Sequence, residues 1–405
     1  MAINKEQNKL NVPPLRFPEF HGEWEEHGLS EYLDFKNGLN PDSKRFGKGI
    51  KFISVMDILN NPVITYDCIR ASVQATDAEM SSFSVEYGDI LFQRSSETLE
   101  DVGRANVYID DKVAVFGGFV IRGKKKANYN PLFFRYLLSS PYARKRIIPM
   151  GAGAQHFNIG QEGLSKVLLN FPSIEEQTKI ASLLHLLDER IATQSKLIED
   201  LKKLKSAIID YAINSLDTDF AKFSSLYEMA GEGGTPTTSN ASFYDNGKIP
   251  FVKIDDLKKK YLTENKDFIT ELGLQKSSVW LVPTRSILFS NGATIGEITI
   301  TTYPVCTKQG ILGIVPKPNI DVEFLYYFMS SSYFRKAVSR IVTEGTMKTA
   351  YLKDINNIRC PIPKKEKQLD IAKMPSALNF KIDFEQSILK LFGSQKQYLL
   401  RQMFM

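Results

Sequence analysis

Cysteine is scarce in this chain of 405 residues. There are three, Cys68, Cys306 and Cys360, an odd number without a CxxC spacing. We therefore expect neither a disulfide framework nor a thiolate zinc site, and we predict a reduced, cytoplasmic protein. No apolar run approaches the ~20 residues that a bilayer span needs, and the opening residues have no apolar signal-peptide core. The sequence predicts no membrane partner and no export.

Motifs of known catalytic sites are also missing. GEGGTPTTS (231–239) lacks the lysine of a phosphate-binding loop, and there is no HExxH, no GxGxxG and no Asn-Pro-Pro-aromatic motif. Four histidines, His21, His27, His156 and His185, are scattered along the chain. We predict no metal site and no catalytic residue in this chain.

The charge of the chain is modestly basic but unevenly distributed. Lys and Arg outnumber Asp and Glu by 52 to 46, for a net charge of +6. Residues 112–161 contain nine basic side chains and no acidic one. Such a stretch is either a solvated lysine-rich face or a surface that faces an anion such as DNA, and composition leaves both interpretations open.

One internal repeat dominates the organisation of the sequence. FFRYLLSSPYARK (133–145) matches FLYYFMSSSYFRK (324–336) at a spacing of 191 residues, with seven of thirteen positions identical. Upstream, GDILFQRSS (88–96) matches RSILFSNGA (285–293) at a spacing of 197. Because solenoid repeats have periods of ~20–50 residues, this spacing indicates a duplicated domain. Each copy begins with short β-like runs and continues into a small helical element, which predicts an α+β domain.

A long helix is expected after each domain. Residues 174–215 contain neither Gly nor Pro, and apolar residues recur at a 3.5-residue period, as in a coiled-coil seam. Adding 191 gives a second seam with polar interruptions at the same places, which favours pairing of the two helices with each other. The alternative is an amphipathic helix that packs only on its own domain. The predicted seam consists of Ile180, Leu184, Leu187, Ile191, Gln194, Ile198, Leu201, Lys205 and Ile208 in the first helix and of Leu378, Ile382, Glu385, Leu389, Phe392, Lys396 and Leu399 in the second.

This arrangement resembles the specificity subunit of type I restriction–modification systems. A β-rich domain, then P-x(4)-Q-x-x-I-A leading into a long helix, is present twice, at FPSIEEQTKIA (171–181) and IPKKEKQLDIA (362–372). One departure is Pro375, which occupies the seam position matching Leu184. We expect the second helix to start near Pro375 or to kink there, and to be shorter or less regular than the first.

The resemblance implies an α+β fold with two homologous target-recognition domains, separated by two long helices that pair as an antiparallel coiled coil in a pseudo-two-fold duplication. The expected boundaries are 1–173 for the first recognition domain, 174–216 for the first helix, 217–363 for the second domain and 364–405 for the second helix. It also implies a chain that binds double-stranded DNA at a bipartite, asymmetric site and performs no catalysis. Two methyltransferase subunits and restriction or translocase subunits would dock on it, and S-adenosylmethionine, ATP and Mg would belong to those partners.

Candidate DNA contacts come from the loops beside the matched strands, because Arg, Asn and Gln can pair with base edges while Lys, Ser and Thr suit phosphates. In the first domain they are Lys44, Arg45, Arg94, Ser95, Arg104, Lys124, Lys125, Lys126, Gln155, His156 and Asn158. In the second they are Thr237, Thr238, Ser239, Asn291, Thr294, Lys308, Gln309, Thr346 and Lys348.

Two other functions stay open at this point. The chain could be a coiled-coil adaptor with two homologous protein-binding domains and no sequence-specific DNA recognition. It could also be an enzyme with an unrecognised site in the β-rich unit, which would show turnover by the chain alone.

Overall fold

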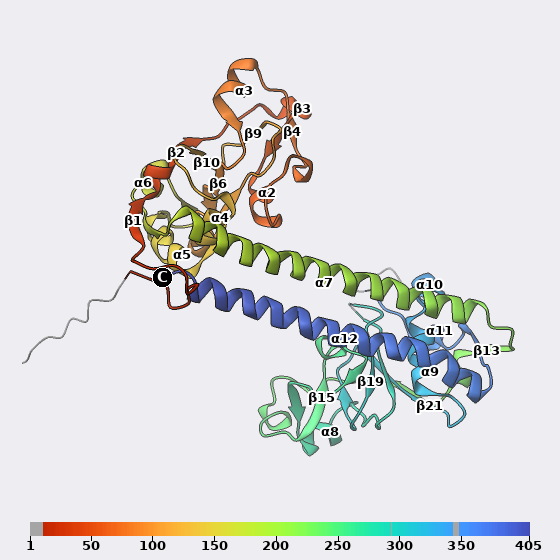
Figure 1. Cartoon of the computed structure of the whole chain (residues 1–405). Coiled ribbons are helices and arrows are strands. Elements are labelled where there is room, and N and C mark those ends of the chain that lie inside the picture. Colours follow the sequence, from red (N-terminus) through yellow and green to blue (C-terminus); the bar gives the residue numbers. More distant parts are fainter. Residues whose placement is uncertain (1–10, 293, 343–347) are drawn as a thin grey trace, which may run out of the picture. The chain divides into compact units, whose positions relative to one another are not determined.

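The chain forms two compact units in its computed structural model, which describes residues 11–292, 294–342 and 348–405 (Figure 1). Unit 1 contains the residues up to Gln194 together with Ile388–Met405, and unit 2 contains Ser195–Ser387. Each unit therefore includes part of both long helices, α7 (Ile174–Asn214) and α12 (Lys365–Gln402). Within the described residues, no helix is both long and apolar enough to cross a membrane.

Unit 1 is a mixed α and β structure. Its strands are β1 (Glu25–Gly28), β2 (Leu33–Asn37), β3 (Phe46–Ile53), β4 (Ser72–Val73), β5 (Ser84–Val85), β6 (Ile90–Gln93), β7 (Ser95–Ser96), β8 (Ala105–Val107), β9 (Ala114–Phe116), β10 (Val120–Lys125), β11 (Phe157–Asn158) and β12 (Leu168–Phe171). Its short helices are α1 (Leu29–Tyr32), α2 (Val55–Asn60), α3 (Asp77–Phe83), α4 (Pro131–Ser139), α5 (Pro141–Ile147) and α6 (Gln161–Ser165). Two four-stranded sheets, β2-β10-β6-β8 and β4-β3-β9-β5, form its β part.

Unit 2 repeats this plan. Its strands are β13 (Phe220–Lys222), β14 (Tyr227–Glu232), β15 (Ile249–Val252), β16 (Tyr261–Leu262), β17 (Asp267–Ile269), β18 (Ile287–Ser290), β19 (Ile298–Thr301), β20 (Cys306–Thr307), β21 (Ile311–Pro316) and β22 (Arg359–Pro361). Its short helices are α8 (Glu271–Gln275), α9 (Val322–Ser330), α10 (Ser332–Ile341) and α11 (Leu352–Ile355). The sheet β14-β21-β18-β19-β16 corresponds to β2-β10-β6-β8. The parallel pair of β15 and β20 corresponds to that of β3 and β9.

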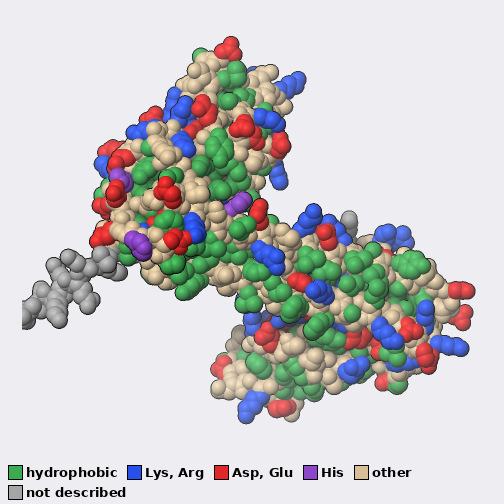
Figure 2. Space-filling model, in the orientation of Figure 1, with side chains coloured by type: hydrophobic (Ala, Val, Ile, Leu, Met, Phe, Trp, Pro, Cys, Tyr) green, Lys and Arg blue, Asp and Glu red, His purple; other side chains and the backbone are tan. Residues whose placement is uncertain are grey.

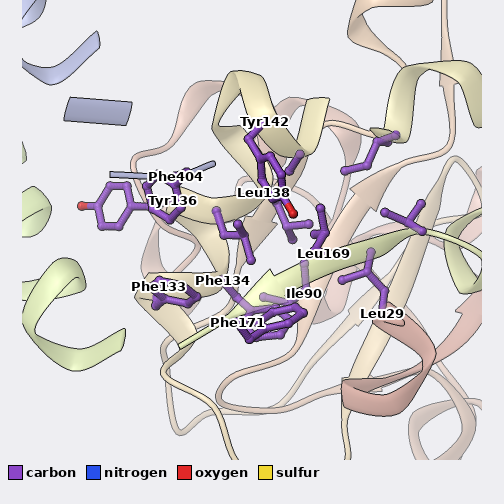
Figure 3. Close-up of a cluster of buried hydrophobic side chains, with 14 of the residues drawn as sticks. Leu29, Ile90, Phe133, Phe134, Tyr136, Leu138, Tyr142, Leu169, Phe171 and Phe404 are labelled. Atoms are coloured by element: carbon purple, nitrogen blue, oxygen red, sulfur yellow. The ribbon is translucent and has the colours of Figure 1, made fainter. Parts of the chain in front are cut away.

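The matched segments of the repeat form the helices that fill each core. In unit 1, α4 starts with Pro131 at its first position and is capped by the side chain of Asn130. This helix buries Phe133, Phe134 and Tyr136 in the core of unit 1, where the ring of Phe134 stacks on Phe171 of β12 and the Tyr136 hydroxyl donates to Asp188 of α7 (Figure 3). In unit 2, α9 contributes the equivalent residues Phe324, Leu325 and Tyr327 to the core. The 191-residue repeat is thus visible as the same helix on the same sheet.

A buried glutamine explains the P-x(4)-Q motif. Gln177 Oε1 accepts a hydrogen bond of 3.1 Å from the backbone N–H of Asn130, the cap of α4, while its Nε2 donates to the carbonyl of Pro172 at 3.1 Å. In unit 2, Gln368 accepts from the cap of α9 at 2.7 Å and donates to the carbonyl of Pro363 at 2.8 Å. Because a buried amide needs both partners, this residue fixes the start of each long helix to its own domain.

The two long helices pair within each unit. In unit 1, Lys396 of α12 forms an ion pair with Asp188 of α7, and the guanidinium of Arg190 lies 5.7 Å from the ring centre of Phe392. In unit 2, Lys205 Nζ donates to Asn379 Oδ1 at 2.9 Å. As numbers rise along α7 they fall along α12, so the pairing within unit 1 is antiparallel, as expected.

The burial of the predicted seam is graded along the helices. The buried members are Ile180, Leu184, Leu187, Gln194, Ile198, Ile382 and Glu385, and the half-buried members are Ile191, Leu201, Lys205, Ile208, Leu378, Leu389, Phe392, Lys396 and Leu399. Near the C-terminal end of each long helix, the buried residue is the one after the predicted seam position. Ile209 is buried in place of Ile208, and Leu400 in place of Leu399. A straight helix drifts by ~20° per heptad against a 3.5-residue period, which brings the next residue towards the core of its own unit.

Of the two alternatives expected at Pro375, a start of the second helix there is wrong, while a kink there stays a prediction. Helix α12 begins at Lys365 and includes Pro375 in its interior, so it is only slightly shorter than α7. A proline inside a helix costs about 3 kcal/mol. Ile371 and Ala372, in the turn before it, are buried in the core of unit 2, and their burial offsets that local cost.

Candidate nucleic-acid interface

Four segments of unit 1 converge at one end of its two sheets. We call residues 38–40, 94–96, 117–119 and 152–158 the first loop set. The backbone N–H of Arg94 donates to Phe119 at 2.9 Å, and that of Ile159 donates to Arg94 at 3.0 Å. The N–H of Leu39 donates to Phe116 at 2.9 Å. These bonds join segments that are far apart in the sequence into one surface.

The same bonds recur in unit 2. We call residues 233–239, 291–292, 294, 308–310 and 348–350 the second loop set. The N–H of Asn291 donates to Gly310 at 2.9 Å, that of Ala350 donates to Asn291 at 2.9 Å, and that of Gly234 donates to Thr307 at 3.1 Å. Asn291 therefore takes the place of Arg94, and Gly310 takes the place of Phe119.

The two loop sets share an unusual composition. Neither contains a single Asp or Glu, although acidic residues make up 46 of the 405 positions. Elsewhere, positive and negative side chains are interspersed over the face of each unit seen in Figure 2. The loop sets themselves lack carboxylates, although the carboxylate of Glu232, directly before the second set, accepts from the N–H of Gly310 at 3.1 Å. A surface with few carboxylates suits a polyanion.

Most of the predicted contact residues lie in these loop sets. The first includes Arg94, Ser95, Gln155, His156 and Asn158, and the second includes Thr237, Thr238, Ser239, Asn291, Thr294, Lys308, Gln309 and Lys348. Most of their side chains are exposed. Thr346 lies outside the described residues. A role in DNA contact remains a prediction for each residue.

Strand pairing brings the polar side chains of the first loop set together. Strand β7 pairs with β11, so Ser95 lies opposite Asn158. Ser95 Oγ donates to Asn158 Oδ1 at 2.5 Å, and Asn158 Nδ2 donates to the carbonyl of His156 at 3.4 Å. Arg94 is half-buried, and its Nη1 donates to the carbonyl of Gly118 at 3.3 Å. One side of the Arg94 guanidinium therefore supports the neighbouring turn.

Asn291 requires a correction. Its side chain is 1% exposed, and its Nδ2 donates to the carbonyl of Ala350 at 3.3 Å. A buried amide that holds the 348–350 segment cannot reach a base edge. Asn291 therefore supports the second loop set in this structure, and the prediction of a direct contact by this side chain is wrong.

Several predicted basic residues lie away from the first loop set. Arg45 forms a two-point ion pair with Glu79, with an Nη1–Oε1 distance of 3.0 Å. Bonds to Glu79 from Arg45 and from the backbone of Thr76 lower the pKa of this carboxyl to about 2. The Arg45 guanidinium is thus engaged within unit 1, while its neighbour Lys44 is exposed.

The lysine run occupies the far end of strand β10. This strand leaves the first loop set at Val120 and reaches Lys125 after a rise of roughly 17 Å. There Lys124 Nζ lies 3.6 Å from Glu86 Oε1. Lys125 Nζ donates to the carbonyl of Tyr129, and Lys126 is exposed. Arg104 also pairs locally, with Asp101 at 2.6 Å. The backbone of Arg104 nevertheless lies next to the first loop set. Its carbonyl accepts a hydrogen bond of 2.7 Å from the N–H of Gln93, the residue directly before Arg94.

Two exposed side chains of the first loop set that are suited to contact DNA were not among the contacts predicted from the sequence. Asn40 is exposed and lies against the Gly118 backbone. Phe119 is 69% exposed, in the turn between β9 and β10. The run AVFGGFVI indicates a strand, and its Gly-Gly pair is the signal that could have revealed the break and the exposed aromatic.

A metal site is not evident in the part of the chain that the structure describes, where no group of three His, Cys, Asp or Glu residues is placed to hold an ion. Cys306 and Cys360 are buried, and burial raises the pKa of the Cys306 thiol to about 11. Neither thiol is placed to act as a thiolate nucleophile.

Comparison with known proteins assigns the chain to a family. Residues 21–203 and 218–391 each match the type I restriction modification DNA specificity domain. The chain belongs to this family. The assignment confirms the resemblance inferred from the repeat, and it favours a specificity subunit over a protein-binding adaptor.

Individual relatives agree with the assignment. The MjaIX specificity subunit of Methanocaldococcus jannaschii is 31% identical over 166 residues, which are 40% of this chain and 37% of that protein. The HindI specificity subunit of Haemophilus influenzae is 22% identical over 408 residues, covering 80% of this chain and 86% of the relative. The crystal structure of a type I S subunit from M. genitalium superimposes with a TM-score of 0.57 at 16% identity, covering 97% of this chain and 99% of that one. The expected fold class is therefore confirmed.

Proposed function

We propose that this chain reads a bipartite, asymmetric site on double-stranded DNA, with one loop set for each half-site. The observation that carries the proposal is the pair of loop sets, which share one backbone scaffold, lack carboxylates and differ in their side chains. Because the backbone scaffold is shared, the two loop sets would bind DNA in the same manner. Different exposed side chains in the two loop sets, such as Asn158 in the first and Gln309 in the second, give two different half-sites.

Phosphate contacts and base contacts would have separate roles in this complex. Lysines and hydroxyl side chains such as Lys308, Lys348 and Thr237 suit phosphates and would make affinity steeply salt-dependent. Amide side chains such as those of Asn158 and Gln309 suit base edges, where a well-placed pair gives about 1–3 kcal/mol of discrimination.

The remaining parts of the complex supply the chemistry. Two methyltransferase subunits and restriction or translocase subunits would assemble on this chain in the cytoplasm, and S-adenosylmethionine, ATP and Mg would act in those partners. The paired helices α7 and α12 would set the number of base pairs between the half-sites. Membership of the specificity-domain family supports the assembly with such partners.

Selection from a random DNA pool tests the proposal. The chain, assembled with its methyltransferase partner, is expected to enrich one motif with two specified halves at several salt concentrations. Asn158→Ala should relax one half, and Gln309→Ala should relax the other. Lys166→Ala is the matched control, because Lys166 is exposed and lies outside the first loop set. Enrichment of no sequence by the wild-type complex would support the adaptor alternative.

A further inference from the structure

Phe119 is the large exposed apolar side chain of the first loop set. Large apolar side chains that are singly exposed are common on proteins and need no explanation by themselves. This one differs in its surroundings. Its turn adjoins Arg94, which adjoins Ser95 and Asn158, and the loop set contains no acidic residue. A ring that is 69% exposed among hydrogen-bonding side chains is a common feature of surfaces that bind nucleic acid bases.

Three hydrogen bonds hold the turn that carries Phe119. The N–H of Val120 donates to the carbonyl of Gly117 at 2.8 Å and closes the turn. Arg94 holds it twice, through its backbone N–H to Phe119 at 2.9 Å and through its guanidinium to Gly118 at 3.3 Å.

Neither glycine before Phe119 has room for a side chain. A Cβ on Gly118 would lie 1.8 Å from Asn40 Oδ1, and a Cβ on Gly117 would lie 2.6 Å from the ring of Phe52. The turn is therefore packed between these two side chains, while the ring of Phe119 extends into solvent. Holding an exposed apolar group in a fixed position lowers the entropic cost of binding through it.

Unit 2 lacks this side chain at the equivalent position. Gly310 accepts the corresponding bond from Asn291, and its φ of +91° disfavours any side chain there. The two loop sets therefore share a scaffold but differ in one apolar projection.

We infer that Phe119 is a specificity-determining residue that makes an apolar contact with a base in the half-site read by the first loop set. The inference rests on the proposed function. Phe119 approaches a base with its ring, either against a thymine methyl group in the major groove or inserted between two base steps, while Arg94 acts as a positioning residue that holds the turn. No equivalent contact exists in the other half-site.

The test measures DNA affinity of the assembled complex at fixed salt. Phe119→Ala should weaken binding to the cognate duplex about 5- to 150-fold, the range for losing one base–aromatic contact. It should leave affinity for non-specific DNA and the salt dependence unchanged, because no charge is removed. Base-by-base substitution of the duplex should show weaker discrimination in one half-site only. Phe119→Leu, which keeps an apolar group, should lose less than Phe119→Ala.

Two further variants separate contact from folding. Tyr87→Ala is the matched control: Tyr87 is 55% exposed and precedes β6, at the opposite end of that strand from Arg94. It should bind as the wild type does. The double variant Arg94→Ala/Phe119→Ala should lose less than the product of the two single losses if Arg94 acts through the turn.

The outcomes distinguish this inference from the proposed function. If the wild-type complex prefers a bipartite motif and Phe119→Ala binds it equally well, or loses affinity equally for cognate and non-specific DNA, Phe119 makes no base contact. If the wild-type complex prefers no motif, the proposed function itself fails.

Discussion

Asp188 connects three parts of unit 1, and its removal should be strongly destabilising. From α7 its carboxylate accepts bonds from Arg135 Nη1 at 3.2 Å and from the Tyr136 hydroxyl at 2.9 Å, both in α4. It also pairs with Lys396 of α12. Asp188→Ala leaves two largely buried cations and a buried hydroxyl without this acceptor. Breaking a buried pair from one side costs about 3–5 kcal/mol, and we expect the lower end because these charged groups are 15–22% exposed.

The two tryptophans allow this loss to be measured in unit 1. Trp24 is buried in the core of unit 1, and Trp280 lies in unit 2. In a Trp280→Phe background, Trp24 is the remaining tryptophan, so fluorescence during urea unfolding reports unit 1. Asp188→Ala should lower the free energy of unfolding of this transition by about 3 kcal/mol, at an unchanged slope.

A matched pair of controls tests the reasoning. Asn379 is the counterpart of Asp188 in unit 2 and accepts a single bond from Lys205. Asp188→Asn, which copies it, should lose less than Asp188→Ala. Asn379→Ala should leave the Trp24 transition unchanged. An unfolding midpoint of Asp188→Ala equal to that of the parent would refute the role assigned to this carboxylate.

Three further predictions follow from single contacts. Arg45→Ala should bring the pKa of Glu79 back from about 2 towards its usual value, as followed by NMR titration. Because Arg45 stabilises the ionised carboxylate, its contribution to stability should be present above pH 4.5 and disappear as pH falls towards 2; an equal difference at all pH values contradicts this. Deleting one heptad from α7 within residues 188–208, with the matching heptad from α12, should shorten the spacing of the selected motif by roughly three base pairs, since seven residues span about 10 Å; an unchanged spacing contradicts the spacer role. Asn291→Ala should lower stability by about 1–3 kcal/mol in thermal unfolding, because its amide holds the carbonyl of Ala350; an unchanged melting temperature contradicts a supporting role.

Much of the fold could be predicted from the repeat and the hydrophobic period. The spacing of 191 residues is reproduced in α4 and α9, and the P-x(4)-Q motif corresponds to the buried Gln177 and Gln368. These features depend on short-range patterns, which a sequence displays directly. At Pro375 two expectations from the sequence conflict: the bounds 364–405 include this proline, whereas its local penalty suggests a start or a kink there. The structure has one helix from Lys365, with Ile371 and Ala372 of the preceding turn buried in the core of unit 2.

The candidate site was only partly predictable. The sequence places Ser95 and Asn158 in loops beside the matched strands. The structure brings these two side chains together although 63 residues separate them, because one strand pair joins them. The engagement of Arg45 with Glu79 and the burial of Asn291 depend on partners far away in the sequence. The sequence could not reveal these two contacts, because the type of a charged or amide side chain does not indicate whether it faces solvent or its own domain.

Methylome sequencing of cells that carry or lack this gene, with the genes of its partner subunits present in both, tests the central claim most directly. The account predicts the loss of one methyl-adenine motif that consists of two specified halves separated by unspecified bases. An unchanged set of methylated motifs, or the loss of a continuous motif without a gap, would contradict recognition of a bipartite site by this chain.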